Sequence, residues 1–543
     1  MMKKITIDIL FLLLIVAHLI GQLVLLGDFS VDDLAFATVL EQTKDTYQHQ
    51  NMILTIKNII KYDNDYSLMD IIDVYPLYPP TFHYLMALLV SFFSGGGYYV
   101  IRCGVLLFSV LIFFLLYGYF RRKKEPLTGL WAVLFAACSP FFLKYSTATT
   151  PYMFMCLCVL FLFIVSEKTD SFRNWGWSLF LGIMSGLCLF VKNEVLMHCC
   201  ALYLVLAIPV ILKPTRRQIG NLVICLCLFG NFLIYFLYLY IYPAFENWYS
   251  VTIDYTRYGG MQNFFSEFSV LSYSKMLFTA LIGPYFTGIV AVAGIIYFIK
   301  PHFRKERNII FLCVIPIIIF SFIITRSFEY VSPLVPLIAI LCARGISMIP
   351  FRVFQGVIVI IACYLTVSAY APPLFNNRLC TIDTTQFEFS KIWDMVDDRI
   401  VTGTPETLPI LIMGNKAEDE SIENYFHLRV LCEGNKYDDI HVENVIGMNY
   451  ARGLTYSLAK TPIFIYVSYS EEDRWPTQEK LWHLLEDHDI ATRGENGIPF
   501  YWQEVMGSKD SFNEVARVQA TIGGKLVYVF LYENRKRIKE KEA

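Results

Sequence analysis

The stretch ITIDILFLLLIVAHLIGQLVLL, Ile5 to Leu26, is followed two residues later by the segment FSVDDLAF, residues 29–36. The first run is long enough to cross a bilayer as a helix, because about 18 consecutive apolar residues suffice. The second holds two adjacent acids, Asp32 and Asp33, between two aromatic residues. Carboxylates so near a bilayer are costly to desolvate, so they usually stay hydrated or belong to a functional site. We therefore predict a transmembrane helix followed by an acidic pair that acts in chemistry at the membrane surface.

The composition is that of a polytopic α-helical membrane protein. Hydrophobic residues make up 56% of the chain and charged residues 17%, and the apolar residues come in runs near twenty rather than in helical stripes. The formal net charge of −2 gives no sign of nucleic-acid binding.

The cysteines do not form a recognisable framework. Of fourteen, only Cys380 and Cys432 lie outside hydrophobic segments, and the sequence leaves open whether these two pair. The others are expected to be small apolar fillers. We expect no metal site and no cofactor.

Clusters of Lys and Arg mark one side of the membrane. They are Lys3-Lys4, Arg121 to Lys124, Lys168 with Arg173, Lys213 with Arg216 and Arg217, and Lys300 with Arg304, Lys305 and Arg307. The positive-inside rule makes that side cytoplasmic. The N-terminus is therefore expected to be cytoplasmic.

This charge distribution predicts eleven spans. They cover residues 5–26, 98–120, 127–145, 150–166, 175–191, 195–212, 219–241, 276–299, 308–325, 331–349 and 353–371. The run Phe82 to Phe93 is too short to span, so we expect it to lie on or dip into the outer leaflet. Residues 27–97 then form one external loop with juxtamembrane helices, and the odd number of spans places the C-terminal region outside. No small-residue cleavage site follows the first span, so we expect it to remain as an anchor.

The composition changes near Leu374, which predicts a membrane domain over residues 1–373 and an external soluble α/β domain over residues 374–543. Predicted strands cover Pro409 to Gly414, Ile463 to Val467 and Lys525 to Leu531, and predicted helices cover Phe387 to Val396 and Gln478 to Asp487. No Gly-rich phosphate loop follows these strands. A structural lid or an acceptor-recognition cap is the favoured role.

Polar residues gather on the predicted external side. Tyr75, Tyr78 and His83 flank clustered prolines, and each is also explained as an interfacial anchor. The external turns contain the bases Lys144, Lys192 and Arg326, and Arg102 lies near the external end of its span. Each of these bases, taken alone, is also explained as a topology marker or as a side chain that snorkels toward the interface. Together, bases facing a pair of acids suit a phosphate at headgroup depth, because cations orient phosphate and a carboxylate takes a proton from a hydroxyl.

The order of these motifs resembles the GT-C membrane glycosyltransferases, above all the protein O-mannosyltransferase and aminoarabinose-transferase type. The resemblance covers roughly residues 5–345. The matching elements are Asp32-Asp33, Tyr75 to Pro80, Arg102 with the basic cluster Arg121 to Lys124, Ser139 to Ser146, Gly186 to Lys192, and Arg326 to Tyr330 with Pro333 and Pro336. Each motif is loose, and the specificity lies in their order and spacing.

The resemblance implies inverting transfer of a sugar from a polyprenyl-phosphate donor to an acceptor hydroxyl at the non-cytoplasmic face. It implies Asp32 as general base with Asp33 as helper or alternative, and Lys192 and Arg326 as holders of the donor phosphate. Arg102 would orient the first loop. The remaining candidates for donor binding are Tyr75, Tyr78, His83, Glu329 and Tyr330.

Two positions depart from the family pattern. Many relatives have an acid where this chain has Thr150-Pro151, and some have a Lys where it has Tyr78-Pro79-Pro80. A second acidic contribution and the manner of phosphate binding therefore stay open. Some members of the superfamily require a metal, but this sequence shows no adequate ligand set.

Two other functions compete with the enzyme. A transporter or flippase of a polyprenyl-linked glycan intermediate predicts charges buried in mid-span, whereas the internal charges here are few. A non-catalytic membrane subunit would leave Asp32 and Asp33 expendable. The expected partners are the bilayer, a polyprenyl-phosphate sugar, and a glycan, lipid or protein acceptor. The expected location is a prokaryotic plasma membrane.

Overall fold

The computed structural model describes residues 2–27, 49, 52–53, 56–57, 60, 79–93, 97–241, 269–299, 304–321, 328–379, 408–414, 440–444, 463–468, 470–472, 474–475, 509–522 and 525–535. The chain divides into two compact units. The first consists of Met1–Gly27, Leu77–Phe82 and Arg102–Leu374, and the second of Asp28–Pro76, His83–Ile101 and Phe375–Ala543.

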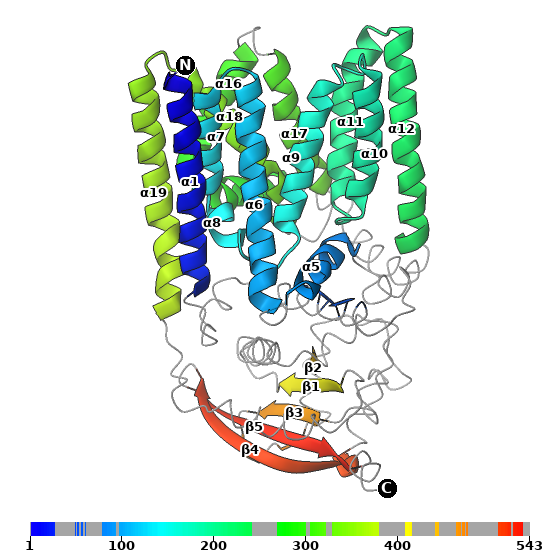
Figure 1. Ribbon diagram of the computed structural model, residues 1–543, viewed down its shortest axis with the longest axis vertical. Coiled ribbons are helices and arrows are strands. Elements are labelled where there is room, and N and C mark those ends of the chain that lie inside the picture. Colours follow the sequence, from blue (N-terminus) through cyan, green and yellow to red (C-terminus); the bar gives the residue numbers. More distant parts are fainter. Residues whose placement is uncertain are drawn as a thin grey trace. The chain divides into compact units, whose positions relative to one another are not determined.

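The first unit is helical, as the apolar runs predict (Figure 1). Among the described residues, five helices are long and apolar enough to cross a membrane: α1 (Met2–Gly27), α6 (Gly97–Arg122), α11 (Val195–Leu212), α12 (Arg216–Phe236) and α19 (Arg352–Leu379). Shorter helices lie between them: α7 (Pro126–Ala137), α8 (Pro140–Tyr145), α9 (Tyr152–Lys168), α10 (Trp175–Leu189), α17 (Arg304–Phe320) and α18 (Val335–Ser347). Helix α5 (Thr81–Ser91), which belongs to the second unit from His83 onward, covers the short run predicted to be juxtamembrane.

The side chains of three long helices identify surfaces suited to lipid. On α12, Val223, Ile224 and Ile234 are exposed, and α1 and α19 also present many exposed large apolar side chains. Such faces are stable in hydrocarbon and unfavourable in water. The chain is an integral membrane protein that crosses the bilayer several times.

The predicted span over residues 127–145 is wrong as a single helix, because the structure has α7 and α8 there. Proline at the first position of α8, Pro140, has no N–H to continue the hydrogen bonding of α7. The side chain of Ser139 instead accepts a hydrogen bond from the backbone N–H of Phe142 at 3.3 Å. The chain thus ends one helix and caps the next within two residues.

The predicted span over residues 276–299 is also interrupted. A segment formed by α15 (Ser269–Lys275) and the π-helix η2 (Met276–Leu281) meets α16 (Pro284–Ile299) at a bend of 116°. Gly283 adopts a φ of +94° at this bend, a conformation that other residues rarely tolerate. With the bent pair counted as one span, six described segments are long enough to cross a membrane.

Small residues bring α10 and α12 into backbone contact. A Cβ atom placed on Gly182 would lie 2.6 Å from the carbonyl oxygen of Cys225, and one on Gly186 would lie 2.4 Å from the ring of Phe232. Small residues allow this kind of close approach between membrane helices.

Charged residues join helices near their ends. Asp8 of α1 accepts hydrogen bonds from Tyr117 at 2.5 Å and from Arg121 at 3.0 Å, both on α6. Arg344 of α18 forms an ion pair with Glu125, the residue before α7. These pairs attach neighbouring helices to one another.

The second unit contains a mixed five-stranded sheet in the order β2-β1-β3-β5-β4. The strands are β1 (Leu408–Gly414), β2 (Ile440–Asn444), β3 (Ile463–Ser468), β4 (Phe512–Ile522) and β5 (Lys525–Asn534). Strands β1, β2 and β3 pair in parallel, and β5 pairs antiparallel with both β3 and β4.

The three strands predicted from the sequence are confirmed as β1, β3 and β5, whereas β2 and β4 were not predicted. Tyr466 of β3 stacks on Phe530 of β5 with ring centroids 6.2 Å apart, and both are buried. The predicted helices at 387–396 and 478–487, together with Cys380 and Cys432, lie outside the described residues.

Candidate functional site

A buried lysine occupies the turn between α10 and α11. Lys192 follows the end of α10 at Leu189, and its side chain is only 1% exposed. Its ammonium group forms an ion pair with Glu329 of the short helix η4 (Phe328–Tyr330) and lies 3.4 Å from Oε1 of Glu194. Because an isolated buried charge is very unfavourable, the two carboxylates explain how this lysine is tolerated.

The two carboxylates differ in their electrostatic environment. Burial raises the pKa of the Glu194 carboxyl, Lys192 lowers it and Glu329 raises it again, with a net upward shift. The Oε2 atom of Glu194 has no hydrogen-bond partner within the described part of the chain. With one cation beside two acids, the neutral form of Glu194 is therefore favoured more than it is in water, and Glu329 balances Lys192.

Aromatic and imidazole side chains surround this cluster. The Lys192 ammonium lies 5.1 Å from the ring centroid of Tyr152. Tyr330 stacks on Phe320 at 5.0 Å, and its carbonyl oxygen lies 3.0 Å from Nε2 of His198 on α11. Burial raises the pKa of the Tyr330 hydroxyl. Aromatic rings therefore surround a small number of polar groups that are held by their contacts.

Two buried threonine hydroxyls precede α9. The side chains of Thr149 and Thr150 are 0% and 1% exposed, and their hydroxyls have no hydrogen-bond partner among the described residues. Buried hydroxyls are normally hydrogen-bonded, so these two are candidates to contact a bound substrate. Thr150 is the position where the sequence departs from the acid of many relatives.

The structure brings together three of the predicted site residues, Lys192, Glu329 and Tyr330. It places Arg102, 2% exposed, on α6 of the first unit. His83 belongs to the second unit, where its Nε2 lies 2.8 Å from Nδ1 of His49. The other predicted residues lie outside the described residues; they are Asp32, Asp33, Tyr75, Tyr78 and Arg326.

Three members of the cluster were missed as site residues: Glu194, Tyr152 and His198. A signal for two of them is present in the sequence. Glu194 follows Lys192 by two residues in a turn too short to leave the interface, and His198 follows Glu194 by four residues, about one helical turn. The contact of Glu329 with Lys192 joins residues 137 positions apart, which spacing alone does not reveal.

Comparisons with known proteins agree with this architecture. Residues 78–242 match the family model described as dolichyl-phosphate-mannose-protein mannosyltransferase, a range that includes Lys192 and Glu194. No curated protein sequence matches the chain.

Two solved structures of ArnT from Cupriavidus metallidurans resemble the whole chain. The apo structure is 13% identical with a TM-score of 0.51, and covers 90% of this chain and 93% of that one. The structure bound to undecaprenyl phosphate is 13% identical with a TM-score of 0.53, and covers 96% of this chain and 97% of that one. The chain therefore has the fold of the GT-C membrane glycosyltransferases that its sequence resembles, with a match to the mannosyltransferase family over residues 78–242.

Proposed function

We propose that this protein is an inverting glycosyltransferase that moves a sugar from a polyprenyl-phosphate donor to an acceptor hydroxyl at the non-cytoplasmic membrane face. The observation that most supports the proposal is the buried Lys192 ion pair, in a chain whose fold is shared with a protein solved in complex with undecaprenyl phosphate. The proposal includes eleven spans, a cytoplasmic N-terminus, an external C-terminal α/β domain and a prokaryotic plasma membrane. The acceptor is a glycan, a lipid or a protein.

The proposed chemistry is a direct displacement. Asp32 takes the proton of the acceptor hydroxyl, and the oxygen attacks the anomeric carbon of the donor sugar. The bond from that carbon to the phosphate oxygen breaks, the configuration inverts, and polyprenyl phosphate leaves with the bonding electrons. Asp33 assists or replaces Asp32. No divalent metal takes part in this scheme.

In this proposal Lys192 binds the donor phosphate. Negative charge grows on the phosphate as the glycosidic bond breaks, and a fixed ammonium group in a dry site stabilises that charge. Glu329 holds Lys192 in position before the donor arrives, and protonated Glu194 donates a hydrogen bond to a phosphate oxygen. Arg326 supplies a second cation, Arg102 orients the first external loop, and Tyr75, Tyr78, His83 and Tyr330 contact the donor.

The charged residues of the helices favour an enzyme over a transporter. Asp8 is paired with Arg121, and Arg344 with Glu125, at or near helix ends. These pairs have an evident role in attaching helices, and they do not form a path of charges through the middle of the membrane.

Replacement of Asp32 and Asp33 by Asn, one at a time, tests the proposed mechanism. Mass spectrometry of surface glycans and lipids, with and without the protein, first identifies the transferred mass and its acceptor. We then expect Asp32→Asn to lower the rate of transfer by purified protein about a hundredfold or more, because it removes the general base. Asp170→Asn, at an exposed loop position, is the matched control. Full activity in both Asp32→Asn and Asp33→Asn would overturn the mechanism.

A further inference from the structure

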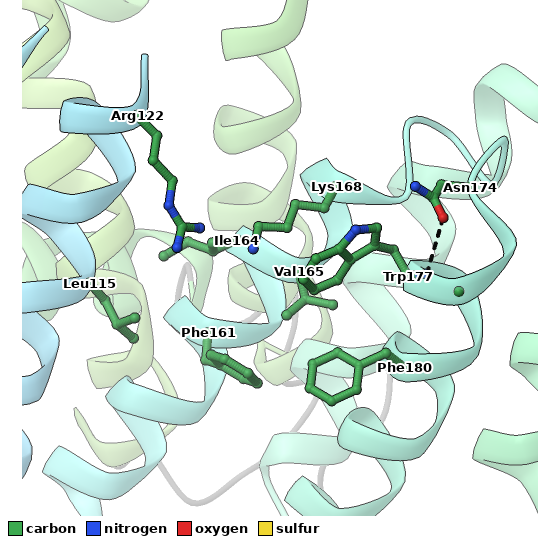
Figure 2. Close-up of a pocket in the computed structure, with 10 residues that line it drawn as sticks. Leu115, Arg122, Phe161, Ile164, Val165, Lys168, Asn174, Trp177 and Phe180 are labelled. Carbon is green, nitrogen blue, oxygen red and sulfur yellow. Dashed lines mark hydrogen bonds between the residues drawn. The ribbon is translucent and has the colours of Figure 1, made fainter. Parts of the chain in front are cut away.

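A cavity of about 590 Å³ lies where α6 and α9 end and α10 begins (Figure 2). We call the end that holds Arg122, Lys168 and Trp177 the mouth, and Leu115, Phe161 and Phe180 line the rest of the cavity (Figure 2). Figure 2 shows that Arg122 and Lys168 come from two different helices and extend toward the same space. No carboxylate lines the cavity.

The two cations at the mouth differ from the bases around them. Within the described residues Arg121 is paired with Asp8, Lys123 with Glu167 at 2.8 Å, and Arg173 with Asp170 at 3.7 Å.

Arg122 and Lys168, in contrast, form no ion pair in the described part of the chain. The Lys168 ammonium instead lies 4.0 Å from the ring centroid of Trp177. Burial and the neighbouring charge of Arg122 lower the pKa of Lys168. An anion between the two bases would relieve this repulsion.

The cavity is amphiphilic along its depth. Leu115 lies seven residues before Arg122, and Phe161 lies seven residues before Lys168, which is about 10 Å along each helix. The positive charges therefore meet the interface, and the apolar side chains continue into the hydrocarbon. Tryptophan at the mouth suits the headgroup level.

We propose that this cavity binds an anionic phospholipid of the leaflet at the Arg122 end, with the phosphate between Arg122 and Lys168 and an acyl chain along Phe161 and Phe180. By the distribution of basic clusters, this is the cytoplasmic leaflet. The site is separate from the Lys192 cluster, because the two lie at opposite ends of α10, about 20 Å apart along the helix. It does not depend on the proposed function.

Fluorescence quenching by a brominated lipid tests this proposal. The full chain is placed in phosphatidylcholine vesicles with increasing fractions of brominated phosphatidylglycerol. The chain has eight tryptophans, so the signal of Trp177 is taken as the difference between the wild type and Trp177→Phe. We expect this component to be quenched at a low fraction of phosphatidylglycerol, and much less by brominated phosphatidylcholine.

The double variant Arg122→Gln/Lys168→Gln, with and without Trp177→Phe, is expected to need roughly ten to thirty times more phosphatidylglycerol for half quenching. The matched control Arg216→Gln/Arg217→Gln removes two exposed charges near the start of α12 and should leave the curve unchanged. If the double variant does not fold, the salt dependence of wild-type quenching replaces it, since screening must weaken a phosphate contact.

Two results would overturn the proposal. They are equal quenching of the Trp177 component by the two brominated lipids, and a double variant that behaves like its control.

Discussion

Lys192 has both a structural role and, in the proposed reaction, a chemical role. As one cation beside Glu194 and Glu329, it compensates buried negative charge, whereas in the proposed reaction it stabilises the leaving phosphate. A single substitution disturbs both roles at once. A pair of substitutions separates them.

We expect Lys192→Met to destabilise the protein by about 3 kcal/mol, because it leaves buried carboxylates without a cation. Lys192→Met/Glu329→Gln removes one of those charges and should recover most of the thermal stability, measured as the Tm in detergent. Sugar transfer should stay at least about a hundredfold below wild type in both variants. Recovery of transfer in the double variant would show that Lys192 only compensates charge.

Glu194 makes the stability of the cluster depend on pH. Burial is the main cause that raises the pKa of Glu194 above its ordinary 4.5, so folding favours the protonated carboxyl. The stability from this group is complete below pH 4.5 and is lost as the pH rises through the folded pKa. Glu194→Gln mimics the neutral acid and should not show this loss. The Tm of Glu194→Gln minus the Tm of the wild type should therefore increase as the pH rises. A difference that stays constant across the pH series would contradict the assignment.

At the scale of elements, the contact between α10 and α12 leaves no room for side chains at two glycines. Gly182→Ala forces a methyl group onto the backbone of Cys225 and should cost roughly 1–3 kcal/mol. Gly220→Ala, on α12, meets nothing within 4 Å and should be neutral or stabilising by up to about 1 kcal/mol. Thermal unfolding of the two variants in the same detergent measures the difference. Equal effects would mean that the two helices separate readily at Gly182.

Helices and strands could be predicted where the length and composition of a segment determine them. They could not be predicted where a single residue determines where a helix begins, ends or bends. Apolar runs must form helices in lipid, because every backbone polar group needs an internal partner. That requirement predicts α6 or α11 but does not show that Pro140 starts a new helix, or that Gly283 accommodates a bend of 116°. Strands β2 and β4 contain polar residues along their length, and this obscures the pattern that revealed β1 and β3.

The candidate site was predictable in part for a similar reason. The basic and acidic turns could be recognised from their place between spans, but the partner of each turn depends on helix packing. Sequence therefore indicated Lys192, Glu329 and Tyr330 separately, and only the structure shows that Lys192 is paired with Glu329. Glu194 was overlooked because a lone acid in a turn is usually solvated.

At the scale of the whole molecule, the order of basic clusters predicts which ends of the chain face which side of the membrane. A cysteine that replaces Lys509, just before β4, should react with a membrane-impermeant maleimide in intact cells. A cysteine that replaces Arg216, at the start of α12, should react only after the membrane is opened. Labelling of the parent chain sets the background, since native cysteines such as Cys227 are exposed. Reaction of both positions from the same side would require a different number of spans.

In the proposed eleven-span topology α10 crosses the bilayer, and its shortness then creates a hydrophobic mismatch. Fifteen residues extend only about 22 Å, whereas the hydrocarbon core of a bilayer is about 30 Å thick. Helix α10 cannot slide to adjust, because its backbone contacts α12 at Gly182. We therefore expect the surrounding lipid to thin beside Leu187, which is 46% exposed. Such thinning would bring the phosphates of that leaflet toward the turn that holds Lys192, so the polyprenyl-phosphate donor of the proposed function would reach this turn without leaving the membrane plane.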